Sequence, residues 1–131
     1  MEKLFNKARE AAAEAAHKQV AKLANEPLGF DCGFAWVIVR PARGPFVNWC
    51  KKQIKEKLTA AGDDWHTKRR AEMVWGHVYG HTAYSGGWQF WKPGTEWYMG
   101  QSISVYEAAC YAFAAVLQEH GIAAHVDSRL D

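Results

Sequence analysis

The stretch Gly-Phe-Ala-Trp-Val-Ile-Val-Arg, residues 33–40, decides the fold of this 131-residue chain. Successive side chains of a strand point to opposite faces of a sheet. Phe34, Trp36 and Ile38 are therefore predicted on one face, and the alanine and valines between them on the other. Both faces are apolar, which is typical of a strand in the middle of a sheet. We therefore predict a central strand here.

Further helices and strands are predicted after this central strand. Amphipathic spacing predicts helices at residues 45–61 and 104–120. Alternating patterns predict strands at residues 73–81, 88–92 and 122–126. The order strand, helix, strand, strand, helix, strand matches the split β-α-β arrangement of ferredoxin-like domains. The sequence thus predicts an α+β fold, with a ferredoxin-like (βαββαβ) antiparallel sheet and both helices on one face.

An extra helix is predicted at the N-terminus, within residues 1–26. Apolar residues, half of them alanine, recur at spacings of three and four from Phe5 to Leu23, and Pro27 is expected to end the helix. This helix either covers the sheet of its own domain or pairs with a second copy as an oligomerisation element. Residues 27–131 are predicted to form one α+β domain.

Composition narrows the class of protein. Hydrophobic residues make up 49% of the chain, and the net charge of +2 is far from the strongly basic balance of a non-specific DNA binder. Three cysteines without a close pair predict neither a disulfide scaffold nor a zinc site. No apolar run approaches the roughly 20 residues that span a bilayer. We therefore expect a cytoplasmic protein without membrane contact.

The aromatic residues around the central strand predict a ligand-binding face. The strand at 88–92 adds either Trp88 and Phe90 or Gln89 and Trp91 to that face. Outward aromatic residues on the first and third strands would stack planar rings, as in RNA-recognition domains. Coverage by the N-terminal helix and pairing of two copies are the alternatives. Arg40 and Arg43 flank a turn before a helix N-terminus, where an anion could be held, or they are exposed residues of a structural turn. The predicted ligand-binding residues are Trp36, Arg40, Arg43, Trp88 and Trp91.

Two histidines suggest a different function. His77 and His81 are four residues apart, so they are expected on one face of either a strand or a helix. Imidazole groups so placed suit a metal site or acid–base catalysis. The alternative is that both histidines are partly buried polar residues of the core.

A basic cluster suggests a third function. It would contact nucleic-acid phosphates or an acidic protein surface, and the alternative is an ordinary solvated helix face. Its residues are Lys51, Lys52, Lys55, Lys68, Arg69 and Arg70.

Several short stretches of the chain, taken together in their order, carry a resemblance to other proteins. They are Cys-Gly-Phe-Ala-Trp-Val at 32–37, Arg-Pro-Ala-Arg-Gly at 40–44 with Phe46-Val47, the Gly86-Gly87 turn, Gln101-Ser102, the helix from Glu107 to Leu117, and Ser-Arg-Leu-Asp at 128–131. In this combination the chain resembles a group of small, uncharacterised proteins encoded by bacteriophages, over somewhat more than half its length. The resemblance implies a viral origin and transfers no activity. Small phage accessory proteins commonly act by binding.

No catalytic signature appears in the sequence. It has no nucleophile elbow, phosphate loop or dinucleotide fingerprint, and we expect no cofactor. The sequence therefore predicts a non-enzymatic phage accessory protein in the host cytoplasm, forming a homo-oligomer. It would inhibit a host or defence protein, or sequester a small nucleotide. The alternatives are a single-stranded nucleic-acid-binding protein and a histidine- or metal-dependent hydrolase.

Overall fold

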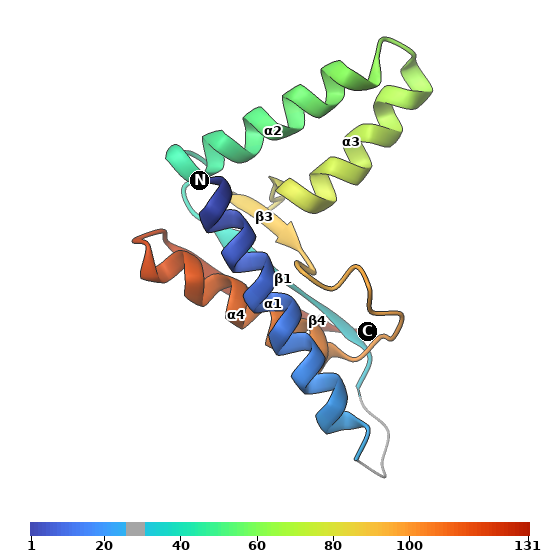
Figure 1. Cartoon of the computed structure of the whole chain (residues 1–131), viewed down its shortest axis with the longest axis vertical. Helices are drawn as coiled ribbons and strands as arrows, with labels where there is room; N and C mark the ends of the chain where they lie inside the picture. Colours follow the sequence, from blue (N-terminus) through green and yellow to red (C-terminus); the bar gives the residue numbers. More distant parts are fainter. Residues whose placement is uncertain (26–30) are drawn as a thin grey trace.

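The computed structural model describes residues 1–25 and 31–131 as an α+β fold with a four-stranded antiparallel sheet. The strands lie in the order β2-β3-β1-β4, so the predicted central strand, β1, is confirmed in the interior of the sheet (Figure 1). The strands are β1 (Gly33–Val39), β2 (His81–Thr82), β3 (Trp88–Trp91) and β4 (Ala124–Leu130). The helices are α1 (Glu2–Leu23), α2 (Pro45–Ala61), α3 (Trp65–Tyr79) and α4 (Ile103–Glu119).

The core lies between one face of the sheet and the helices. Val37 and Phe90 face each other across β1 and β3, and both are almost fully buried. The ring centroid of Phe90 lies 5.0 Å from that of Phe113 on α4 and 5.9 Å from that of Phe46 on α2. These contacts place α4 and the first turn of α2 on the same face of the sheet. The helices predicted at 45–61 and 104–120 are thereby confirmed.

α1 packs along α4 by means of its alanine stripe (Figure 1). Ala8, Ala12 and Ala16 have no exposed surface, and Phe5 at the start of the stripe is also buried. Alanine lacks a bulky side chain, so the two helices can approach closely. The stripe is therefore occupied within the chain. The predicted helix end at Pro27 lies outside the described residues.

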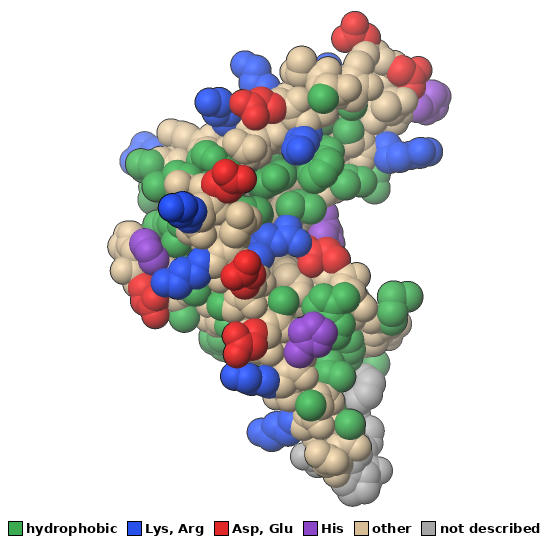
Figure 2. All heavy atoms as spheres, viewed as in Figure 1, with side chains coloured by type: hydrophobic (Ala, Val, Ile, Leu, Met, Phe, Trp, Pro, Cys, Tyr) green, Lys and Arg blue, Asp and Glu red, His purple; other side chains and the backbone are tan. Residues whose placement is uncertain are grey.

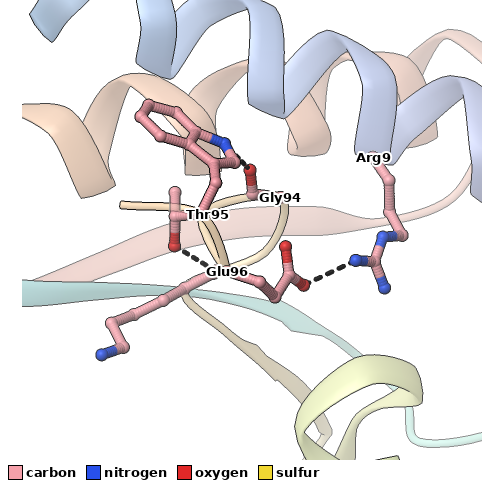
Figure 3. A network of polar contacts seen from close by, with 6 residues as sticks. Arg9, Gly94, Thr95 and Glu96 are labelled. Carbon is pink, nitrogen blue, oxygen red and sulfur yellow. Dashed lines mark hydrogen bonds and ion pairs between the residues drawn. The ribbon is translucent and has the colours of Figure 1, made fainter. Parts of the chain in front are cut away.

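The loop after β3 fastens α1 to the domain (Figure 3). The Arg9 guanidinium contacts the Glu96 carboxylate at 2.6 Å. The Trp97 indole N–H donates to the Gly94 carbonyl at 2.9 Å, and its ring stacks on His17 with centroids 3.7 Å apart. The Arg9–Glu96 ion pair and the stacking of Trp97 on His17 both join α1 to this one short loop, so the loop and the helix hold each other in place.

The strand predicted at 73–81 is wrong: most of this stretch belongs to α3, and only β2 follows it. Asp64 begins the helix, since its carboxylate accepts the Thr67 backbone N–H at 2.9 Å. Gly80, with φ of 96°, ends it. The aromatic and histidine residues at every second position imitated a strand, while the half-buried side chains of Trp75 and Tyr79 have the four-residue spacing of a helix.

α2 and α3 form a helical arm that projects from the sheet (Figure 1). α3 has no fully buried side chain, and α2 buries only residues near its start, namely Phe46, Val47 and Cys50. The arm is thus anchored at its base, and most of its length is open to solvent.

The final strand also differs from the prediction, since it runs from Ala124 to Leu130 and not from 122 to 126. β4 is an edge strand of the sheet and pairs only with β1. Its second half, with Asp127, Ser128 and Arg129, is exposed. In the sequence, a polar stretch such as residues 127–129 is hard to tell from an unstructured C-terminal tail, because neither face of this part of the edge strand needs to be apolar.

The surface over α1 carries interspersed positive and negative charges, with no large patch of one sign (Figure 2). Within the described parts of the chain, no helix combines the length and the apolar character needed to cross a membrane.

Candidate functional site

The face of the sheet opposite α4 carries half-exposed aromatic side chains. In an antiparallel pair, residues directly opposite each other share a face. Trp36 on β1 lies opposite Trp91 on β3, and Ile38 lies opposite Gln89. Of the two predicted arrangements of the third strand, the one with Gln89 and Trp91 on this face is therefore confirmed. Trp36, Trp91 and Phe34 are each partly exposed.

These three rings form one contiguous cluster, which we call the aromatic platform (Phe34, Trp36 and Trp91); Trp36 and Trp91 are stacked, and Phe34 is tilted against Trp91 by 34°. The ring centroids of Trp36 and Trp91 are 5.4 Å apart with planes at 24°. The centroids of Phe34 and Trp91 are also 5.4 Å apart. A half-exposed stack of this kind offers its remaining faces to another flat ring.

Positive charges lie at one end of the aromatic platform. The Lys92 Nζ is 5.6 Å from the Phe34 centroid and 5.9 Å from the Trp91 centroid, and it lies 5.0 Å from the centroid of Tyr106 on α4. All three distances are within reach of a cation–π interaction. Arg129 on β4 lies directly opposite Phe34 and is exposed. Asp127, opposite Trp36, is the neighbouring negative charge. An anionic group bound beside the rings would contact the lysine and the arginine first.

His77 and His81 come together, but not on one element as the sequence predicted. His77 belongs to α3 and His81 to β2, and both line a hollow of about 270 Å³ beside Trp91. Burial lowers the pKa of His77 from its usual 6.5, and the nearby Lys92 lowers it further. The His77 imidazole is thus uncharged at neutral pH. In residues 1–25 and 31–131, no cluster of three or more His, Cys, Asp or Glu side chains could hold a metal ion.

Trp88 lies apart from Trp36 and Trp91, on the core face of the sheet. It is 5% exposed, and its indole N–H donates to the Tyr79 carbonyl at 2.9 Å. Arg40 lies on β1's open side, yet its guanidinium donates to Ser85 Oγ at 3.2 Å and to the Gly86 carbonyl at 3.3 Å. Its charge therefore supports the β2–β3 turn.

Arg43 lines a pocket of about 250 Å³ at the start of α2, and Arg40 lines the same pocket. Pro45 and Gly121 also line this pocket. The five predicted ligand-binding residues thus fall into three environments: Trp36 and Trp91 share the sheet face opposite α4, Trp88 lies in the core, and Arg40 and Arg43 line one pocket.

The predicted basic cluster lies on the arm. Lys51, Lys55 and Lys68 line a groove of about 490 Å³ between α2 and α3. Lys52 lies beside Lys55 at a second, smaller hollow. The guanidinium of Arg69 lies 5.7 Å from the Trp65 ring centroid on the exposed surface of α3. Arg70, the last residue of the set, is also exposed.

The two buried thiols are poor nucleophiles in the folded chain. Burial raises the pKa of Cys50 to about 12 and raises that of Cys110 strongly. Cys32 is the exposed one of the three. Since the thiolate is the reactive form, neither buried cysteine suits covalent catalysis at neutral pH.

Two basic residues near the aromatic platform, Lys92 and Arg129, were absent from the predicted site. Lys92 directly follows Trp91, so its place could have been noted once that tryptophan was assigned to the face. Arg129 lies in the part of β4 that the sequence did not predict as strand, and no sequence signal marked it.

Comparison with known proteins adds no relative. No protein-family model, no curated protein and no solved structure matches this chain. Any function must therefore be argued from the geometry just described.

Proposed function

We propose that this chain is a non-enzymatic binding protein that holds single-stranded nucleic acid on the open face of its sheet. One observation carries the proposal: Trp36, Trp91 and Phe34 form a partly exposed aromatic cluster on the sheet face opposite α4. Bases of any sequence present a flat π-face, and each base stacked on an aromatic side chain contributes about 1–3 kcal/mol.

The shape of this face favours a strand over a free nucleotide. Pockets for small molecules typically enclose most of the ligand surface, whereas the aromatic platform is a partly exposed part of a sheet face and not an enclosed pocket. The predicted tryptophans and arginines also do not form one nucleotide site, since Trp88 is buried in the core and Arg40 and Arg43 line a pocket that no predicted tryptophan lines. An extended strand needs only successive stacking contacts and adjacent positive charge.

The few positive charges near the aromatic platform are suited to contact the phosphates of a single strand. Lys92 and Arg129 lie next to Phe34. Residues 45–79, which include the arm, add seven basic against four acidic residues. Binding that uses two or three of these cations would weaken with salt, with a slope of roughly −0.7 per neutralised phosphate.

We also infer that the sheet is a ferredoxin-like sheet with two additions. With α1 and α3 set aside, the element order is β1-α2-β2-β3-α4-β4, which is the split β-α-β order. β1 and β3 are the two inner strands, and they carry the outward aromatic residues. The same placement serves base stacking in RNA-recognition domains. The resemblance to phage-encoded proteins adds the infected host cell as the proposed setting.

The experiment measures binding of a fluorescent 12-nucleotide oligothymidine by anisotropy at low salt. We expect Trp91→Ala to weaken binding about 5- to 150-fold, which corresponds to the loss of one stacked base. Tyr111→Ala is the matched control, because Tyr111 is an aromatic residue of α4 with 61% exposure. It should bind like the unmodified protein.

Two results would overturn the proposal. One is the absence of measurable binding at low salt, and the other is equal binding by the Trp91→Ala and Tyr111→Ala variants. If the protein is instead a dimer in which Trp36 is shielded from acrylamide quenching, the face is an interface between two copies.

A further inference from the structure

The hollow beside Trp91 extends the aromatic platform towards α3. It has a volume of about 270 Å³, slightly below the range of about 300–1,000 Å³ typical of drug-sized ligands. Trp91 is a wall of this hollow and a member of the aromatic platform at once. A group bound in the hollow can thus belong to the same strand that stacks on the sheet. The lining residues are Glu72, Met73, Gly76, His77, His81 and Trp91.

The lining combines a flat wall with hydrogen-bonding groups of two kinds. The Glu72 carboxylate is an acceptor with two oxygens and donates nothing when ionised. An uncharged imidazole has one N–H donor and one acceptor nitrogen, and the lowered pKa of His77 keeps its ring in that form. Gly76 has no side chain, so the α3 backbone leaves room at this point. The hollow therefore offers stacking on one side and both an acceptor pair and a donor at its edges.

We propose that this hollow takes one unstacked guanine of the bound strand, with its ring on Trp91 and its donor edge on Glu72. This inference rests on the proposed function. The ring N–H and the exocyclic amino group of guanine are adjacent donors, and they match the two oxygens of one carboxylate. The neighbouring carbonyl oxygen of the base accepts from an imidazole N–H of His77 or His81.

The other bases fit this lining less well. Adenine and cytosine place an unprotonated ring nitrogen beside their amino group, and that nitrogen would face the carboxylate as a second acceptor. Thymine has a single N–H between two carbonyl oxygens, of which one would lie against the carboxylate. A bidentate base contact discriminates against a wrong base by about 1–3 kcal/mol, so the preference should be for guanine.

The test compares a 12-nucleotide oligothymidine with the same oligomer carrying one central guanine, adenine or cytosine. The readout is the ratio of affinities, measured by anisotropy. We expect the guanine oligomer to bind roughly 5- to 150-fold more tightly than the others, the range of one bidentate base contact. Hypoxanthine in place of guanine lacks the exocyclic amino group and should lose most of this preference.

Two variants assign the preference to the hollow. Glu72→Gln places an amide donor against the guanine donors, and the affinity ratio should fall to near one. Glu56→Gln removes the same charge from an exposed position on α2, and the ratio should remain. Circular dichroism of both variants verifies that the arm is still folded.

The outcomes separate this inference from the function on which it rests. If oligothymidine binds and guanine gives no increase, or if Glu72→Gln keeps the increase, the guanine site is wrong and the sheet-face proposal stands. If no oligomer binds, both fail. A guanine preference that Glu72→Gln alone removes supports the inference.

Discussion

Gly94→Ala tests how α1 is seated on the domain. Gly94 has φ of +73°, a left-handed conformation that side chains rarely adopt. A Cβ at this position would lie 2.8 Å from the Ala12 Cβ and 2.9 Å from the Arg9 carbonyl oxygen. Both atoms belong to the body of α1, which cannot yield as a flexible side chain can. The substitution therefore pushes α1 away from the loop that fastens it.

Gly121→Ala is the matched control for the backbone conformation. Gly121 has φ of +77°, and a Cβ there would meet nothing within 4 Å. A left-handed alanine costs about 1–2 kcal/mol in either position. Crowding of a packed interior adds about 1–3 kcal/mol at Gly94 only. We expect losses of about 1–2 kcal/mol for Gly121→Ala and about 2–5 kcal/mol for Gly94→Ala.

Urea unfolding followed by tryptophan fluorescence measures both losses. With a slope of about 1–3 kcal/mol per molar urea, the midpoint of Gly94→Ala should lie on the order of 1 M below that of Gly121→Ala. Equal midpoints would show that α1 does not pack against this loop, and the reasoning about the alanine stripe would fail. Refolding curves that coincide with the unfolding curves confirm that the comparison is at equilibrium.

Two further predictions concern titratable groups. One equivalent of a thiol reagent should react with the native protein at neutral pH, at Cys32, and three equivalents after denaturation; fast native labelling of Cys50 or Cys110 would contradict the assigned burial. Burial lowers the pKa of His77 in the folded state below its usual 6.5. When the pH falls below 6.5, the unfolded chain therefore binds the proton before the folded chain does, and the free energy of unfolding decreases. His77→Gln should lose less unfolding free energy than the unmodified protein between pH 7 and pH 5, and equal losses would refute this assignment.

Much of the fold could be predicted because its strongest signals are local. The apolar run of β1 and the bounds of α2 depend on residue type and on end signals such as Gly62. α3 was predicted wrongly because its exposed surface leaves no clear apolar stripe. Without such a stripe, helical and strand spacing explain residues 73–81 about equally well.

The candidate site was harder to predict, because it depends on which strands pair and in which register. Whether Trp88 or Trp91 joins Trp36 is decided by the pairing of β3 with β1. A shift of one residue would exchange the two tryptophans between the core and the open face. The four-residue spacing of His77 and His81 predicted that they lie on one face of a single helix or strand. They are neighbours for another reason, because Gly80 ends α3 and the chain turns there into β2.

β4 has a protective consequence beyond its contribution to the sheet. It pairs with β1 along the full length Gly33–Val39, so it covers the backbone N–H and C=O groups of the most apolar strand in the protein. A chain without β4 would present that strand as a free edge, which is the usual template for fibril growth between molecules. β4 itself is a poor template, because its second half carries Asp127 and Arg129. A polar strand at the border of the sheet thus keeps a self-associating strand out of reach of other copies.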